Sequence, residues 1–283
     1  MTSGDCGIVY VATVNDRFIE EAFLSAESVK QRFPDLAITL FTGRPEHPLS
    51  GLSCFDSVQR TESVQSFGSH WAAGQLARLR CLPRTPYART LHLDTDTRVL
   101  TEELPWLFDR LAENDVAMVE TADDDSFSRL YAGLRMFNAG LILYRRTEQV
   151  WKWLDTWEKL TERNFRLADQ SPEPIIPLLR NVGDGSVRRR LLYMDQISLV
   201  EILNPGGNAF GLSVLNLDYP WNHRGSRKPE NNRSVVKILH APPLKGLTHP
   251  DILAVAFAWK RAGRSEDAAA LRAYIDGLYS GPI

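Results

Sequence analysis

The sequence lacks a strong charge of either sign, and it lacks a long apolar run. Its 283 residues carry 33 Lys and Arg against 35 Asp and Glu, a formal net charge of -2. This balance gives no electrostatic footprint for nucleic acid. No apolar stretch approaches the length needed to cross a membrane, and Met1–Asp5 have neither the basic nor the apolar part of a signal peptide. We therefore predict no nucleic-acid partner and no transmembrane segment.

Cysteine is also scarce. Cys6, Cys54 and Cys81 are odd in number and widely separated, so they match neither a zinc-binding spacing nor a disulfide framework. A reducing, cytoplasmic location is the expectation. Internal repeats, low-complexity tracts and linker-like segments are absent as well. The simplest prediction is one domain over residues 1–283, with a helical C-terminal segment at about 249–283.

The pattern of apolar residues indicates an α/β fold. Residues 8–14 (IVYVATV) and 36–41 (LAITLF) are continuous apolar runs, which are typical of strands buried on both faces. Between them, apolar residues recur at helical spacing up to Pro34, so the opening of the chain reads as a βαβ unit of a parallel sheet. Further strands are expected over 53–59, 91–93, 116–120, 136–144, 210–217 and 235–239, and further helices over 70–82, 102–111, 147–160, 194–203 and beyond 251. In the helix over 147–160, Trp151, Trp153 and Trp157 are expected to be core residues.

Two carboxylates follow one of these strands directly. The run Leu91-His92-Leu93 ends in Asp94-Thr95-Asp96, and charge at the end of a buried strand is costly unless a cation neutralises it. Ligands of open α/β sheets bind at the carboxyl ends of strands. Asp94 and Asp96 therefore fit a site for Mg²⁺ or Mn²⁺ that also holds a phosphate. The alternative reading is a polar turn, because Asp and Thr are common turn residues.

Polar residues recur at the ends of other apolar runs, which favours one shared crevice. They are Thr13, Asn15 and Asp16; Asn138; Asp195 and Gln196; and His240 with Lys245.

The ordered set of these motifs resembles a known family. The sequence is similar to the metal-dependent glycosyltransferases of the GT-A fold, and most of all to the retaining group that includes glycogenin and the bacterial lipopolysaccharide galactosyltransferases. The resemblance covers roughly residues 8–246 and implies a GT-A-like (Rossmann-like) mixed, mostly parallel sheet flanked by helices. It rests on Ala77-Arg78-Leu79, the Asp-x-Asp motif at 94–96, Phe137-Asn138-Ala139-Gly140, Asp195-Gln196, and the late His240 and Lys245.

The resemblance implies a metal site and a diphosphate site. Asp94, Asp96 and His240 would hold Mn²⁺ or Mg²⁺, and an imidazole ligand favours manganese. The resemblance implies that the metal would bridge the diphosphate of a UDP-linked nucleotide-sugar, and that Arg78 and Lys245 would add positive charge to the same leaving group.

The resemblance also implies the contacts to the rest of the donor. Thr13 and Asp16 would contact the nucleobase and ribose. Asn138 and Gln196 would hydrogen-bond the transferred sugar, and Asp195 would accept from its hydroxyls or help to orient it. The pattern matches the retaining group, and it does not specify the acceptor.

Two other classes of protein also fit the sequence motifs. Asp94-Thr95-Asp96-Thr97 also fits the Asp-x-Asp-x-Thr motif of haloacid-dehalogenase-like phosphatases, in which Asp94 would be the nucleophile and Asp96 the general acid. That chemistry needs a lysine before a late acidic pair, and none lies between Asp96 and the acidic run 123–125. A non-catalytic protein that binds sugar nucleotides is the third possibility.

Overall fold

The structure is a computed structural model of the 283-residue chain. It describes residues 5–13, 15–62, 67–68, 70–121, 136–203, 210–224, 236–240 and 248–279. The strands are β1 (Cys6–Ala12), β2 (Ala37–Thr42), β3 (Ser57–Arg60), β4 (Arg89–Leu93), β5 (Thr97–Val99), β6 (Val116–Glu120), β7 (Phe137–Arg145), β8 (Val214–Leu217) and β9 (Ile238–His240). The helices are α1 (Asp16–Lys30), α2 (His70–Cys81), α3 (Leu104–Asp109), α4 (Glu148–Gln170), α5 (Gly185–Leu192), α6 (Asp195–Leu203), α7 (Thr248–Arg261) and α8 (Ser265–Tyr279).

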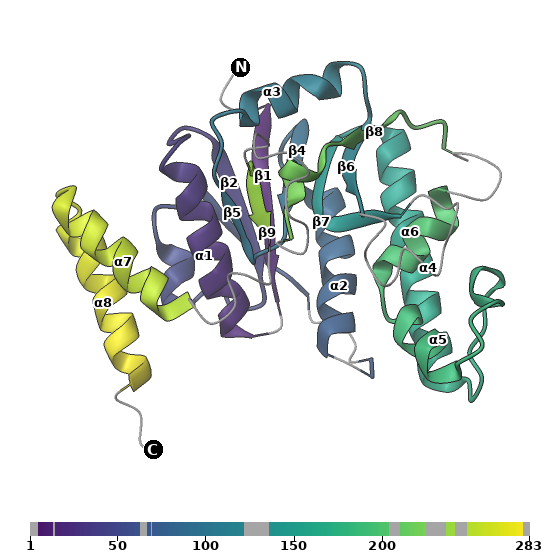
Figure 1. Ribbon diagram of the computed structural model, residues 1–283. Coiled ribbons are helices and arrows are strands. Elements are labelled where there is room, and N and C mark those ends of the chain that lie inside the picture. The colour runs from purple at the N-terminus through teal and green to yellow at the C-terminus, as the bar shows by residue number, and fades with distance from the viewer. Residues whose placement is uncertain are drawn as a thin grey trace.

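Seven strands form the central sheet, in the order β3-β2-β1-β4-β7-β6-β8. β7 is antiparallel to both of its neighbours, and the other pairs in this sheet are parallel. In Figure 1 the N-terminus lies at the top, and β1 and the strands parallel to it run downward. This is the mixed, mostly parallel α/β sheet that the sequence predicts.

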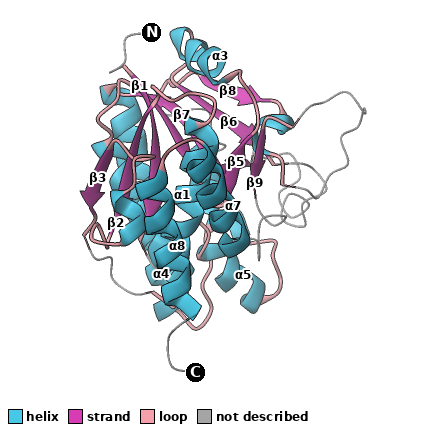
Figure 2. Ribbon diagram, turned by 90° about the vertical axis from the view of Figure 1, so that its left-hand side faces the viewer, coloured by secondary structure: helices cyan, strands magenta, loops and turns pink. Residues whose placement is uncertain are grey.

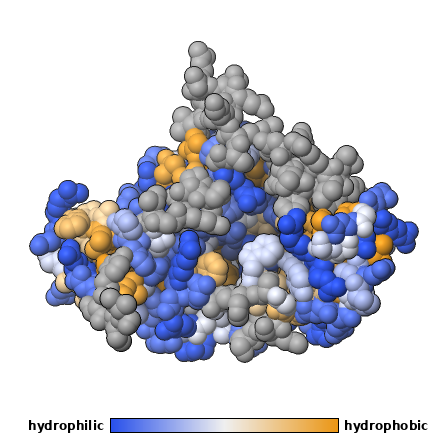
Figure 3. Space-filling model, turned by 60° about the horizontal axis from the view of Figure 1, so that its bottom comes forward, coloured by the Kyte–Doolittle hydropathy of each residue, from blue (hydrophilic) through white to orange (hydrophobic). Residues whose placement is uncertain are grey.

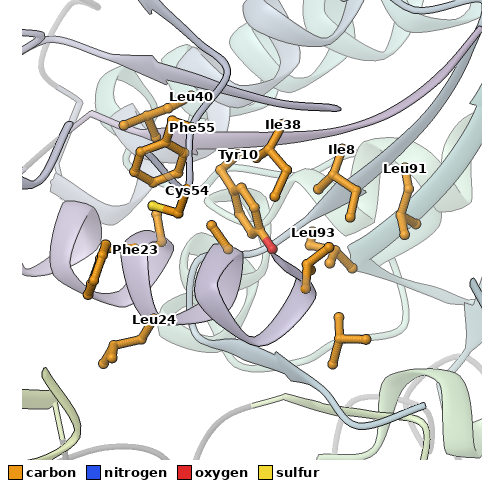
Figure 4. Close-up of a cluster of buried hydrophobic side chains, with 14 of the residues drawn as sticks. Ile8, Tyr10, Phe23, Leu24, Ile38, Leu40, Cys54, Phe55, Leu91 and Leu93 are labelled. Atoms are coloured by element: carbon orange, nitrogen blue, oxygen red, sulfur yellow. The ribbon is translucent and has the colours of Figure 1, made fainter. Parts of the chain in front are cut away.

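One face of the sheet packs against α1. Ile8 and Tyr10 of β1 are fully buried with Phe23 of α1, and Figure 4 shows side chains of neighbouring strands pointing toward the same helix. The phenol of Tyr10 is satisfied inside this core by a 2.8 Å hydrogen bond to the Ser25 hydroxyl. Residues 8–12 of the predicted run therefore lie in β1 as expected, because a strand covered on both faces needs apolar side chains on both.

The other face is covered by α2, α4 and α6, which pack on β6 and β7. Trp153 and Trp157 of α4 are fully buried there, whereas Trp151 is 44% exposed. The expectation of a core role is thus right for two of the tryptophans and wrong for Trp151. The reason is the helical period: residues 153 and 157 share a face, and residue 151 lies on another.

The C-terminal helices α7 and α8 pack on the outer side of α1 (Figure 2). The Trp259 indole donates a 2.7 Å hydrogen bond to Glu27, and the Tyr274 hydroxyl donates one of 2.5 Å to Glu20. Both glutamates are buried residues of α1. Hydrogen bonds as well as apolar contacts therefore hold α7 and α8 against α1. Among the described residues, no helix is both long and apolar enough to cross a membrane.

A second, two-stranded sheet positions the site. β5 follows the Asp94–Asp96 turn at once, and it pairs antiparallel with β9 from late in the chain. In this register Thr97 lies opposite His240. The pairing therefore brings His240 beside the two carboxylates.

Candidate metal and donor site

The Asp94–Asp96 turn lies at the carboxyl end of β4, in the middle of the sheet. The backbone N–H of Asp94 donates a 2.8 Å hydrogen bond to the Gly140 carbonyl of β7, and the Thr97 hydroxyl donates one of 2.8 Å to the Asp94 carbonyl. These bonds fix the backbone from which both carboxylates project. Figure 3 views the molecule from the side of these strand ends, where the described surface is mostly hydrophilic.

Asp94, Asp96 and His240 form a cluster that fits a divalent cation. His240 Nε2 is 3.5 Å from Asp94 Oδ2 and 3.3 Å from Asp96 Oδ1, and one ligand atom from each residue lies within 4.8 Å of the others. Adjacent ligands of an octahedral ion with bonds of about 2.1 Å are about 3 Å apart, so small shifts would bring the three atoms to one ion. Burial alone would lower the pKa of His240, but the two carboxylates outweigh it and raise the pKa to about 9. The imidazole thus faces an environment that favours positive charge.

Arg78 of α2 connects this cluster to α6. Its guanidinium donates a 2.7 Å hydrogen bond to Asp94 Oδ1 and forms an ion pair with Asp195. Burial would raise the pKa of Asp94, but Arg78 and His240 outweigh it and hold that pKa well below its usual value. Burial likewise raises the pKa of Asp195, and Arg78 opposes that rise. Arg78 thus contacts two carboxylates, those of Asp94 and Asp195, while Asp96 faces His240. A divalent cation beside Asp94 and Asp96 would balance the remaining negative charge.

The backbone of Asp195 is held from two sides. Its N–H donates a 2.9 Å hydrogen bond to Gln75 Oε1, and its carbonyl accepts one of 2.8 Å from the Trp157 indole. The side chain is only 3% exposed. Asp195 is therefore a fixed partner of Arg78, while the next residue, Gln196, is half-buried and lines a cavity.

Two cavities flank the Arg78–Asp94 pair. The larger, of about 330 Å³, is lined on the side of β7 and α6 by Asn138, Asp195, Gln196, Arg224 and His240. The smaller, of about 150 Å³, lies toward the end of β1 and is lined by Val11, Thr13 and Phe18, among others. Trp71, Gln75, Arg78, Asp94 and Asp96 line both.

The structure therefore brings together most of the residues predicted from the sequence. Asp16 is the exception among the described ones: it begins α1, its carboxylate pairs with Arg44, and it does not line either cavity. Lys245 and the acidic run 123–125 lie outside the described residues.

Gly140 is required at the site for its small size. A Cβ atom at this position would lie 2.2 Å from His240 Cε1 and 2.9 Å from an oxygen of Asp94. The Gly140 backbone N–H also donates a 2.9 Å hydrogen bond to Asn138 Oδ1. The Phe-Asn-Ala-Gly segment of β7 thus packs directly against Asp94 and His240.

Several residues of the site were not predicted from the sequence. Gln75 shares the inner face of α2 with Arg78, three residues away, and that spacing is a signal that could have found it. Trp71 and Arg224 line the cavity, and Asn222 contacts His240. No motif in the sequence marks these three.

The comparisons with known proteins identify the fold. No protein-family model matches the sequence, and no curated protein does either. Among solved structures, the chain is similar to the galactosyltransferase LgtC in complex with donor and acceptor sugar analogues, at 14% identity and a TM-score of 0.50, over 98% of this chain and 97% of that one. It is also similar to the glycosyltransferase GlyE of Streptococcus pneumoniae TIGR4, at 16% identity and a TM-score of 0.53, over 98% of this chain and 65% of that one. The chain has the GT-A fold of glycosyltransferases, which confirms the fold class predicted from its sequence.

Proposed function

We propose that the protein is a metal-dependent glycosyltransferase that uses a nucleotide-sugar donor, UDP-linked, and acts with retention of configuration. The observation that carries the proposal is the cluster of Asp94, Asp96 and His240 beside Arg78, at the strand ends of a GT-A fold. The acceptor is left open. A hydrolysis screen over a panel of nucleotide-sugars with Mn²⁺ present tests the proposal, and cleavage of none of them would refute the transferase function.

The two cavities suit the two halves of such a donor. The nucleoside would occupy the smaller cavity near Thr13, and the sugar would occupy the larger one near Asn138 and Gln196. The diphosphate would then lie between them, over Arg78 and the metal ligands.

The chemistry of the step is to stabilise the departing nucleoside diphosphate. A Mn²⁺ or Mg²⁺ ion, when bound, supplies Lewis-acid stabilisation of that leaving group. Asp94, Asp96 and His240 would hold the ion, and Arg78 would add a fixed positive charge next to it. Asp195 holds the Arg78 guanidinium in place through their ion pair. Lys245 is a proposed further contact to the diphosphate.

The geometry of Asp94 disfavours the phosphatase alternative. A carboxylate nucleophile needs a free oxygen directed at phosphorus. In this structure Oδ1 accepts from Arg78, and Oδ2 faces His240 at 3.5 Å. A non-catalytic sugar-nucleotide-binding protein would bind the donor in the same screen without cleaving it.

Nucleotide binding gives the first prediction. UDP with Mn²⁺ is expected to raise the melting temperature, because a ligand that binds only the folded state stabilises it by mass action: at 100 times its Kd the gain is about 2.7 kcal/mol. ADP and GDP should give smaller shifts, and phosphomonoesters smaller ones still. Differential scanning fluorimetry measures all of these. Equal shifts for the three nucleotides would contradict the uridine preference, and a larger shift with phosphomonoesters would favour the phosphatase.

Stereochemistry gives the second prediction. Asp195 is buried and engaged by Arg78, so it is poorly placed to deprotonate an acceptor hydroxyl. In a retaining reaction the acceptor attacks from the side of the leaving group, and a diphosphate oxygen takes the proton. An α-linked donor should therefore give an α-linked product, and Asp195→Asn should retain measurable transfer. The anomeric proton coupling of the product decides this by NMR. A β-linked product together with complete loss of activity in Asp195→Asn would overturn retention and make Asp195 the base.

A further inference from the structure

A chain of hydrogen bonds runs from the backbone of β7 to the ring of His240. Gly140 N–H donates to Asn138 Oδ1 at 2.9 Å, and the Asn222 amide donates to the same oxygen at 2.9 Å. The other end of the Asn222 amide is 2.7 Å from His240 Nδ1. Asn138, Asn222 and His240 are all buried, at 6%, 2% and 5% exposure. Water therefore does not readily replace any bond of this chain.

The direction of every bond in the chain follows from its first member. A backbone N–H can only donate, so the side-chain atom of Asn138 that faces Gly140 must be its carbonyl oxygen. The atom of Asn222 that meets this oxygen must then be its NH₂ group, which leaves the Asn222 carbonyl oxygen toward His240. A flipped Asn222 amide would place its oxygen against the Asn138 oxygen, so that two acceptors would meet with no hydrogen between them. Buried polar groups without partners are costly.

The consequence for His240 is a defined role for each ring nitrogen. Because Asn222 presents an acceptor, Nδ1 must carry a hydrogen. In the neutral ring the lone pair is then on Nε2, which is the nitrogen 3.5 Å from Asp94 and 3.3 Å from Asp96. Imidazole ligands of metals commonly donate their second N–H to such an oriented acceptor.

We propose that Asn138 and Asn222 form a positioning relay that holds His240 in the tautomer and orientation in which Nε2 binds the divalent cation. The relay rests on the metal site of the proposed function. It also changes the role expected for Asn138, because its carbonyl oxygen is committed to Gly140 and Asn222. Only its NH₂ group is left to contact a donor sugar. Asn222 acts through His240 and is a positioning residue.

The first test needs no variant. The wild-type protein is labelled with ¹⁵N-histidine and loaded with diamagnetic Zn²⁺, and the ring nitrogens of His240 are assigned by NMR. The relay requires Nδ1 protonated and Nε2 bound to the metal. Coordination through Nδ1 would overturn it, and so would a wild-type protein that binds no divalent cation.

The second test measures Mn²⁺ affinity by electron paramagnetic resonance, without any donor. Asn222→Leu removes the acceptor and is expected to weaken Mn²⁺ binding roughly 10- to 100-fold, the usual effect of losing an outer-shell partner. Asn222→Asp keeps an oxygen toward Nδ1–H and should bind Mn²⁺ much more tightly than Asn222→Leu. Asn216→Leu is the matched control, since Asn216 is exposed on β8 and its two side-chain bonds are to Glu120.

The outcomes separate the relay from the transferase. Unchanged Mn²⁺ affinity in Asn222→Leu overturns the relay even if the protein cleaves nucleotide-sugars. The expected NMR pattern and affinity loss, in a protein that cleaves no nucleotide-sugar, would support the relay and refute the transferase. If Asn222→Leu does not fold, the wild-type NMR spectrum and Asn222→Asp still decide: an aspartate variant that binds Mn²⁺ like the wild type supports the relay, and one that loses binding opposes it.

Discussion

The Asp96→Asn variant is expected to lose transfer activity by roughly 100- to 1000-fold, because a metal that stabilises a leaving group supplies several kcal/mol and each 1.36 kcal/mol is a factor of ten. Excess chelator should cause a similar loss in the wild type, with best recovery on adding Mn²⁺. The fold should persist, since Asp96 lies on a turn outside the core with its side chain 24% exposed. Nucleotide-sugar cleavage assays and a melting curve measure the two effects.

Asp155→Asn is the matched control for this variant. Asp155 is an exposed carboxylate of α4 that pairs with Lys159, and it does not belong to the cluster of Asp94, Asp96 and His240. It should keep full activity and near-normal Mn²⁺ affinity. If Asp96→Asn is as active as this control, or if the wild type works in excess chelator, the metal assignment is wrong.

The Arg78→Met variant is expected to be the most destabilised single variant of the site. Methionine keeps the apolar stem but removes the charge that faces Asp94 and Asp195. Breaking a buried ion pair by removing one partner costs about 3–5 kcal/mol, because the remaining charges are left uncompensated. For a chain of this size, that corresponds to a melting temperature lower by roughly 6–20 °C. Urea unfolding in metal-free buffer measures the free energy, and added Mn²⁺ should restore part of it.

Two comparisons test the physical cause. Arg80→Met removes a cation of the same helix whose partners, Glu158 and Glu162, are partly exposed, so it should cost no more than about 1 kcal/mol. The double variant Arg78→Met/Asp195→Asn should be more stable than Arg78→Met alone, because the asparagine leaves no uncompensated charge at that position. A double variant that is less stable still, or an Arg80→Met variant as unstable as Arg78→Met, would show that the buried charges are not the reason.

The parts of the fold that depend on local pattern were predictable. Residues 8–12 of the first predicted run lie in β1, and residues 37–41 of the second lie in β2. Asn15 caps α1 by accepting from Phe18 N–H, as its residue type suggests. α4 is longer than the predicted 147–160 and extends to Gln170. Buried Phe165 and Ala168 continue its apolar face, so the sequence does carry the helical pattern beyond residue 160. The predicted helix ended too early.

Two short elements were not predicted, for different reasons. β5 has three residues and pairs with β9 from far along the chain, so no local pattern marks it. α5 has a local pattern that hides it, because it has eight residues, begins at a glycine and includes three consecutive arginines.

The same division applies to the site. Asp94 and Asp96 stand out in the sequence because charge directly follows an apolar run. Asn222 gives no such signal, because its proposed role depends only on where β9 and β7 place His240 and Asn138. Asp16, which the resemblance assigns with Thr13 to the nucleobase and ribose, forms an ion pair with Arg44 that its residue type does not predict. A polar residue at a strand end predicts that the residue lies at the crevice. It does not predict which side chains that residue contacts, because those side chains come from other elements.

The pairing of β5 with β9 has a consequence for the synthesis of the protein. Asp94 and Asp96 leave the ribosome long before His240, with more than half of the chain between them. Short-range contacts form first in folding, and pairings between distant segments come late because they must close a long loop. A nascent chain that already has β1, β2 and β4 would thus present two carboxylates without the imidazole. At the proposed metal site, the third ligand would arrive only when β9 pairs with β5. A chain that stalls before residue 240 would therefore lack that ligand.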